Sequence, residues 1–216
     1  MNKIDPIQDL QEIRRLMEGS SKFISLSGLS GVFAGLTALG GSVAGYILLR
    51  NFIKLQEHYY FSGRFDEAAE ALKMKLFVIA VTVLVLALGF GVLFTYLKAK
   101  KQNLKLVSAV SFRLVRSLMT PLFFGGIFTL GLIYKEAYVM IAPVTLIFYG
   151  MSLLNASKYV QVELKYLALC QMALGTVAVF FFSANIQFIC WALGFGVLHI
   201  LYGGLMWWKY DRNVTS

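Results

Sequence analysis

The sequence predicts an all-α fold, a polytopic membrane bundle of six transmembrane helices with an N-terminal amphipathic helix. Hydrophobic residues make up 58% of the 216 residues, and only 14% are charged. Soluble globular domains carry about 25% charged residues. Charge-free runs long enough to cross a bilayer alternate here with short charged clusters, which indicates one membrane domain over residues 23–208.

The net charge of +9 comes from short basic clusters beside the apolar runs, not from one basic stripe. This arrangement is typical of membrane topology, so we expect the lipid bilayer as a partner and no nucleic acid. A second copy of the chain, or a membrane or cytoplasmic protein, is a further expected partner. We expect no cofactor and no metal site, because the Cys, His and acidic residues lack metal-site spacing. Cys170 and Cys190 are expected to be free thiols inside spans.

Residues 1–22 predict an amphipathic helix on the cytoplasmic membrane surface. Asp5 is a suitable N-cap, and Pro6 follows at the first helical position. The apolar residues at helical spacing form one stripe opposite the charges. They are Ile7, Leu10, Ile13 and Met17.

The first span, residues 23–49, is the helix around which we expect the others to pack. Small residues recur along it at spacings of three and four, so they share one face. They are Gly28, Gly31, Gly35, Ala38, Ser42 and Gly45. Membrane helices associate through close backbone packing at such faces, and we interpret this one as a helix-packing surface.

The second span is predicted over residues 76–97. It follows a polar segment, residues 50–75, in which Ser62-Gly63 reads as a turn. From Asp66 the residues favour helix strongly, so this helix is expected to begin in water.

The basic segment 98–116 has apolar residues at helical spacing, which predicts an interfacial helix before the third span, residues 118–134. An earlier start of the third span is the alternative. Lys135-Glu136 then reads as a tight turn.

Three further spans are predicted over residues 137–155, 166–182 and 188–208, followed by a tail over residues 209–216. Of the 20 Lys and Arg residues, fourteen fall on the side that holds both termini and six on the other. The positive-inside rule therefore predicts that both termini are cytoplasmic.

The heptapeptide ALGFGVL occurs twice, at residues 87–93 and 192–198. We interpret the two copies as a shared Gly-x-Gly packing surface, with an internal duplication as the alternative.

The acidic residues all lie outside the spans or at their margins, which argues against an ion-coupled transporter with a carboxylate at the midplane. Pro143 is expected to kink the fourth span. His199 is the ionisable residue nearest to mid-membrane, and a buried imidazole needs hydrogen-bond partners. At similar depth the neighbouring helices offer a set of polar side chains. They are Tyr149, Ser152, Gln171 and Tyr202, with Ser30 on the first helix.

Two interpretations of this polar cluster remain open, a structural clamp and a ligand or gating site. A third concerns Gly28-Leu29-Ser30-Gly31, which with His199 is similar to the serine–histidine pair of rhomboid intramembrane proteases. The rhomboid serine lies on the fourth span, whereas this motif lies on the first. No residue is assigned as catalytic on this basis.

Several long stretches resemble a family of small bacterial six-helix inner-membrane proteins that has no assigned function. The likeness covers nearly the whole chain and includes IRRLMEGSSKFISLSGLSGVFAGLTALGG, YGMSLLNASKY and WALGFGVLHILYGGLMWWKYDR. It implies the fold and a bacterial inner membrane but no reaction. We therefore expect a non-enzymatic regulatory or scaffold subunit or a small-ligand transporter, with a rhomboid-like serine hydrolase as the alternative.

Overall fold

The computed structural model describes residues 27–101, 109–181 and 183–212, and every element in them is helical. The helix expected over residues 1–22 and the end of the tail lie outside the described residues. The main helices are α2 (Gly28–Phe61), α3 (Phe65–Lys101), α4 (Ala109–Tyr134), α5 (Ile141–Ala156), α6 (Glu163–Ala178), α7 (Ala184–Trp191) and α8 (His199–Met206). Two π-helical segments, η3 (Ala192–Leu198) and η4 (Trp207–Asp211), join α7 to α8 and extend α8. Short 3-10 turns, η1 (Tyr138–Met140) and η2 (Ser157–Tyr159), flank α5.

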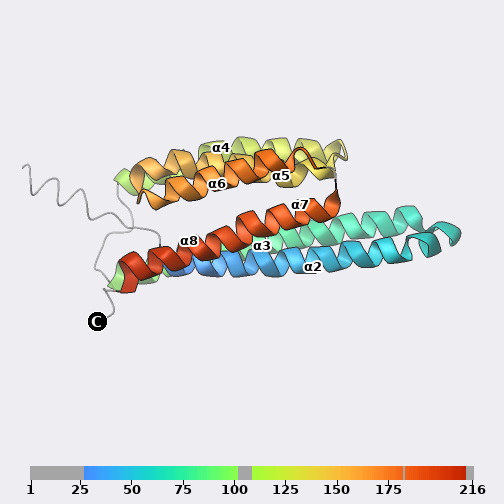
Figure 1. Ribbon diagram of the computed structural model, residues 1–216, viewed down its shortest axis with the longest axis horizontal. Helices are drawn as coiled ribbons and strands as arrows, with labels where there is room; N and C mark the ends of the chain where they lie inside the picture. Colours follow the sequence, from blue (N-terminus) through green and yellow to red (C-terminus); the bar gives the residue numbers. More distant parts are fainter. Residues whose placement is uncertain (1–26, 102–108, 182, 213–216) are drawn as a thin grey trace, which may run out of the picture.

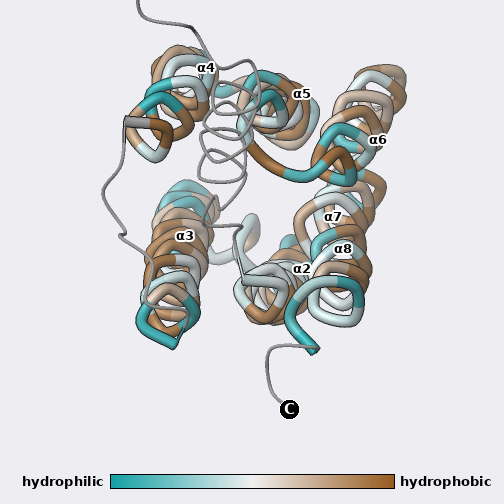
Figure 2. The backbone as a smooth tube through the Cα atoms, turned by 90° about the vertical axis from the view of Figure 1, so that its left-hand side faces the viewer, coloured by the Kyte–Doolittle hydropathy of each residue, from teal (hydrophilic) through white to brown (hydrophobic). Residues whose placement is uncertain are grey.

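The helices form two layers of three (Figures 1 and 2). In one layer α2 lies between α3 and the α7–α8 rod, and in the other α5 lies between α4 and α6. The α7–α8 rod also contacts α5 and α6, and so joins the layers along one side. The other side is different, because α3 packs mainly on α2 alone.

Five helical stretches are long and apolar enough to cross a membrane: Gly28–Phe61, Phe65–Lys101, Val110–Tyr134, Tyr138–Tyr159 and Ala184–Asp211. The all-α bundle and its membrane character are therefore confirmed. The expected fifth span corresponds to α6, which has 16 residues and runs alongside α5 (Figure 1). At ~1.5 Å per residue α6 is about 24 Å long, somewhat less than the ~30 Å hydrocarbon core.

The polar segment 50–75 is helical on both sides of its turn. Helix α2 continues to Phe61, Ser62 and Gly63 form the turn, and α3 begins at Phe65. Gly63 has φ 69°, a left-handed conformation that glycine adopts without a Cβ clash. The prediction of a turn here and of a second helix that begins before its apolar run is correct.

The third helix begins earlier than the predicted span. Helix α4 is continuous from Ala109, so the described part of the expected interfacial helix belongs to the spanning helix itself. The alternative of an early start is the correct one. The expected kink at Pro143 is wrong, because α5 begins at Ile141 and Pro143 lies in its first turn, where no N–H is needed.

Pro121 lies in the interior of α4. Because proline lacks an N–H, the carbonyl of Ser117 four residues earlier loses its helical donor. The Asn155 side chain of α5 supplies one, with Nδ2 donating to Ser117 O at 2.9 Å. This bond joins α4 to α5 where α4 is weakened.

Asn155→Ala is expected to destabilise the protein by about 1 kcal/mol or more, because it leaves the Ser117 carbonyl without a donor. Thermal unfolding in detergent measures the loss. In a Pro121→Ala background the backbone N–H at position 121 returns, so the same Asn155→Ala change should cost less. An equal cost in both backgrounds would show that the Asn155 bond does not compensate for the proline.

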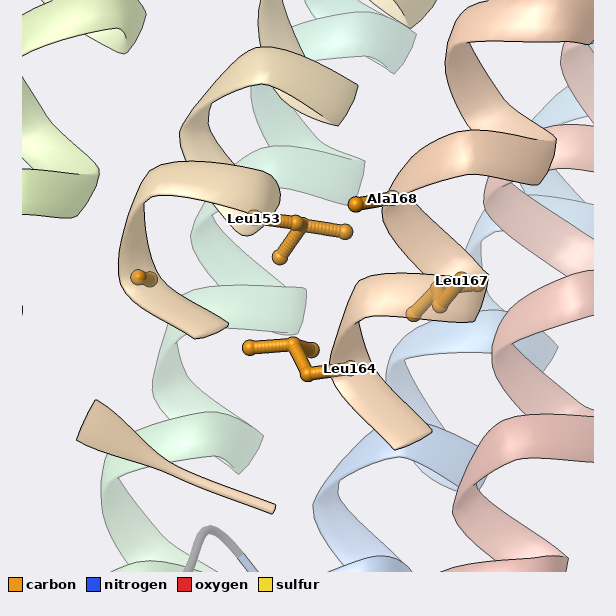
Figure 3. Close-up of a cluster of buried hydrophobic side chains, with 5 residues drawn as sticks. Leu153, Leu164, Leu167 and Ala168 are labelled. Atoms are coloured by element: carbon orange, nitrogen blue, oxygen red, sulfur yellow. The ribbon is translucent and has the colours of Figure 1, made fainter. Parts of the chain in front are cut away.

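The buried core of the α4–α6 layer lies between α5 and α6 (Figure 3). It consists of Leu153, Ala156, Leu164, Leu167 and Ala168. Leu114 and Leu118 of α4 pack against this cluster from one side, and Leu198 and Tyr202 pack from the α7–α8 rod. The cluster therefore joins four helical elements at the end of the bundle where α2 begins and η4 ends.

Candidate functional site: a polar cluster between the two layers

His199 opens α8 and reaches from one layer into the other. Its Nε2 lies 2.9 Å from the Tyr149 hydroxyl of α5, and its Nδ1 lies 3.0 Å from the carbonyl oxygen of Gly194 in η3. The Gln171 side chain of α6 donates from Nε2 to the same carbonyl at 2.7 Å. His199 is 7% exposed and Gln171 is fully buried. The structure thus brings together three of the predicted residues, one from each of α5, α6 and α8.

The hydrogen bonds define the tautomer of His199. A carbonyl oxygen only accepts, so the bond to Gly194 requires the proton on Nδ1. Nε2 then accepts from the Tyr149 hydroxyl. Gln171 Nε2 also lies 3.4 Å from Nδ1, but two donors cannot bond one another, so this approach is a contact only. Both ring nitrogens of the neutral imidazole are therefore occupied.

The Gly194 carbonyl of the π segment η3 accepts two side-chain hydrogen bonds. The backbone N–H of His199 donates to Gly196, and Gly194 O accepts from the His199 and Gln171 side chains. A Cβ on Gly194 would lie 2.3 Å from Leu146 of α5 and 2.7 Å from Gln171 Oε1. Glycine at this position lets α5 and α6 approach the backbone, which explains why the cluster forms at ALGFGVL. Single π-helical turns inside α-helices are frequent at functional sites.

Three of the predicted cluster residues lie outside the hydrogen-bonded group. The Ser152 hydroxyl donates to Phe148 O within α5, and Tyr202 packs against the leucine cluster of Figure 3. The Ser30 hydroxyl donates to Ser27 O at the start of α2. In the part of the chain described here the imidazole pairs with Tyr149 and not with Ser30, so the serine–histidine pair of a hydrolase is not assembled.

The small-residue face of α2 lies against two neighbours. Gly28, Gly31 and Gly35 face the α7–α8 rod. A Cβ added at Gly28 would lie 2.2 Å from Trp207 N, and one added at Gly31 would lie 3.0 Å from the Gly203 Cα. A Cβ added at Gly35 would lie 2.6 Å from Gly196 O. Ala38 and Ser42 are buried, and the Ser42 hydroxyl donates to Ala38 O at 2.9 Å. At Gly45 an added Cβ would meet Phe188 of α7 at 2.8 Å and Leu76 of α3 at 3.3 Å.

Asp211 is a contact residue that sequence reasoning missed, because it was assigned to a free tail. Its Oδ2 accepts from the backbone N–H of Gly28 at 2.8 Å and from the Ser27 hydroxyl at 3.4 Å. Its Oδ1 lies 2.7 Å from Lys98 Nζ at the end of α3, and both side chains of this ion pair are about nine-tenths buried, at 12% and 11% exposed. A carboxylate at a helix N-terminus complements the free N–H groups there. We call these contacts the Asp211 clasp.

A second set of contacts ties η4 to the other layer. Lys209 donates to the Glu163 carboxylate at the start of α6, and the Tyr210 hydroxyl donates to the same oxygen at 3.0 Å. The hydrogen bond from Lys209 holds the pKa of Glu163 below its ordinary value. The segment Trp207–Asp211 thus contacts both layers at one end of the bundle. The sequence signal for these contacts was an acid, Asp211, three residues after the aromatic pair Trp207-Trp208 that ends the last predicted span.

At the opposite end, Lys73 of α3 joins the layers. Its Nζ lies 3.3 Å from Glu136 in the α4–α5 turn and 5.4 Å from the ring centre of Tyr138. The two layers are therefore linked by charged groups at both ends and by the His199–Tyr149–Gln171 cluster between them.

Comparison of the chain with protein-family models, with curated proteins and with solved structures finds no match.

Proposed function

We propose that the chain is a non-enzymatic scaffold or regulatory subunit of a bacterial inner membrane, which binds a partner protein through the tip of the α2–α3 hairpin. The observation that carries this proposal is the length of the hairpin. Helices α2 and α3 have 34 and 37 residues, whereas a bilayer needs about 20. The charge-free stretch of α3 is residues 76–97, so most of its charged length, residues 65–75, lies at the hairpin end, and a shorter part, residues 98–101, lies at the other.

The hairpin end, residues 50–75, is about 16–18 Å of paired helix at ~1.5 Å per residue, and it projects beyond the contact of Lys73 with Glu136. Phe52 joins the two helices through Phe65 of α3, with ring centres 5.6 Å apart, and it stacks on Tyr59 of its own helix at 6.0 Å. Tyr60 and Phe61, at the end of α2, are 74% and 85% exposed. Aromatic residues exposed in water at the end of a rigid element favour a protein contact.

The charges of the projection indicate the chemistry of the partner. Basic and acidic residues are nearly balanced over residues 50–75, and Arg64 pairs with Glu67 and Lys73 with Glu70. A surface that binds a polyanion or an anionic lipid carries an excess of basic residues. We therefore propose a protein partner with an apolar recess that accepts the aromatic tip.

The proposed topology has six spans and both termini in the cytoplasm, so the hairpin tip faces the outer side. It rests on the asymmetry of Lys and Arg between the two sides and on α6 running beside α5 over the same length (Figure 1). We propose that α6 crosses the membrane with the other five helices despite its 16 residues.

A photo-cross-linking amino acid at position 61 tests the proposed docking surface. In native membranes it is expected to give one discrete adduct with a second protein, which is then purified and mixed with the full chain in vesicles. Tyr60→Ala should weaken this binding about 30-fold, the loss of a ~2 kcal/mol anchor residue. Tyr134→Ala is the matched control, because Tyr134 is an aromatic residue 83% exposed at the end of α4. Equal effects of the two changes, or the absence of any adduct, would refute the docking surface.

A small-ligand transporter is the second candidate, and the interface between the layers favours it. Substrate sites of transporters lie near the midplane where a broken helix meets its neighbours. The cluster lies beside the π segment, and Gln171 Oε1 is buried without a hydrogen-bond partner among the described residues. Reaction of His199→Cys with a membrane-impermeant thiol reagent would indicate a water path and favour transport.

Labelling by a fluorophosphonate probe that Ser30→Ala abolishes would favour the hydrolase alternative.

A further inference from the structure

Helix α3 has a long apolar face that no other part of the described chain covers. The residues that contact α2 lie on one side of α3. They are Leu76, Ile79, Val83, Phe90 and Phe94, which meet Gly41, Gly45 and the Phe33 ring. The opposite side is exposed along the whole span, and α3 is the edge helix of its layer (Figure 2).

The exposed side has a regular heptad pattern. With Ala71 at position a, the a positions hold Ala71, Val78, Val85 and Val92, and the d positions hold Met74, Val81 and Leu88. Ala71 is exposed, and the others are 64% (Met74), 54% (Val78), 42% (Val81), 61% (Val85), 55% (Leu88) and 72% (Val92) exposed. We call these seven residues the α3 seam. Alternating steps of three and four over three heptads are the pattern of a two-helix contact.

The residue types in the seam match a parallel pair. β-Branched residues at a favour two strands when leucine occupies d. Here valine occupies three of the four a positions, and leucine occupies one of the three d positions, Leu88, with Met74 and Val81 at the other two. Copies of one membrane protein have the same orientation in a bilayer. Two α3 helices from neighbouring copies therefore run parallel, as such a pair requires.

The first two seam residues, Ala71 and Met74, precede the apolar run 76–97, and their surroundings favour a protein neighbour over lipid. Ala71 and Met74 lie among Glu70, Lys73 and Lys75, where the helix is still charged and lipid tails do not reach. Glu70 is at position g and Lys75 is at position e. In a parallel pair the g residue of one helix lies beside the following e residue of the other, so Glu70 of each copy meets Lys75 of its neighbour. The same parallel alignment of two α3 helices that pairs their seam residues therefore also pairs Glu70 with Lys75 of the other copy.

From these observations we infer that the α3 seam binds a second copy of this chain, forming a parallel, two-fold symmetric dimer about an axis along the membrane normal. The interface is isologous, because each copy contributes the same seven residues. It leaves Tyr60 and Phe61 out of the contact, so this inference goes beyond the proposed docking of a partner protein.

Disulfide cross-linking of the full chain in native membranes tests the dimer. Cys170 and Cys190, both free, are first replaced by alanine. Val85→Cys, in the centre of the seam, is expected to give a cross-linked dimer on mild oxidation. Two controls are matched to it: Leu86→Cys, 45% exposed but off the seam, and Val83→Cys, which faces α2. The yield from Val85→Cys should exceed both several-fold, whereas equal yields or no dimer would overturn the inference.

Charge reversal tests the register of the dimer without altering its apolar residues. In the Val85→Cys chain, Glu70→Lys and Lys75→Glu should each lower the cross-linking yield, and the two changes together should restore it. Failure of the double change to restore the yield would overturn the proposed register and with it the parallel seam. Tyr60→Ala should leave the yield unchanged, which separates failure of the dimer from failure of the docking surface.

Discussion

Gly203→Ala is expected to destabilise the bundle severely, although it adds a single methyl group. A Cβ at Gly203 would lie 2.5 Å from the backbone N of Val32, 2.6 Å from Gly28 O and 2.8 Å from the backbone carbon of Gly31. All three atoms belong to the α2 backbone, so no side-chain rotation relieves the contact. Overpacking typically costs ~1–3 kcal/mol, and we expect about 3 kcal/mol here.

Gly204→Ala is the matched control for this prediction. No atom lies within 4 Å of a Cβ at Gly204, one residue further along α8. Alanine in a helix interior is favoured over glycine by up to ~1 kcal/mol, so Gly204→Ala should leave stability unchanged or raise it. Thermal unfolding of the two variants in one detergent measures the difference. Similar losses for both would show that the α2–α8 backbone contact is not the close one.

Asp211→Ala is the second change with a large expected effect. It removes the acceptor of the Gly28 N–H and leaves Lys98 without its carboxylate at a site where the lysine side chain is 11% exposed. Removal of one partner from a buried ion pair costs ~3–5 kcal/mol, and we expect the lower end because the long lysine side chain can still reach water. Unfolding in detergent measures the loss.

Two further variants test the charge within the Asp211 clasp and separate the clasp from the neighbouring Lys209–Glu163 pair. Asp211→Asn keeps an oxygen for the Gly28 N–H and loses only the charge, so it should destabilise less than Asp211→Ala. Lys209→Met breaks the pair with Glu163, in which the lysine side chain is 54% exposed, and should cost less than about 1 kcal/mol. The clasp interpretation fails if Lys209→Met and Asp211→Ala destabilise equally.

The two ALGFGVL heptapeptides show where sequence reasoning ends. Residues 87–93 are α-helical within α3, whereas residues 192–198 form the π segment η3. Local propensity is identical, so the difference comes from the surroundings. At Gly194 the carbonyl accepts from Gln171 and His199, whereas an added Cβ at Gly89 or Gly91 would meet nothing within 4 Å. The duplication alternative receives no support from backbone conformation.

Contacts between residues far apart in the sequence were also the part of the site that the sequence did not predict. Helix composition and periodicity predicted the all-α bundle, the hairpin turn at Gly63 and a close-packing face with Gly28 and Gly35, because these follow from the residue pattern along one helix or turn. The contact between Asp211 and Gly28 joins positions 183 residues apart, and no local pattern encodes it. Depth along each helix placed His199, Tyr149 and Gln171 at one level, but it could not exclude Ser30, whose hydroxyl points to its own helix.

Helix α2 runs without a break from the Asp211 clasp at Gly28 to Tyr60 and Phe61, so its two ends move together as one rigid element. Its 34 residues span about 51 Å at ~1.5 Å per residue. A tilt of about 10° pivoting at the clasp would carry Phe61 sideways by about 9 Å, given that length. The Gly28 contact and the aromatic end of α2 are therefore joined by one unbroken helix, so a change of tilt at one end would be transmitted to the other with no rearrangement inside the helix.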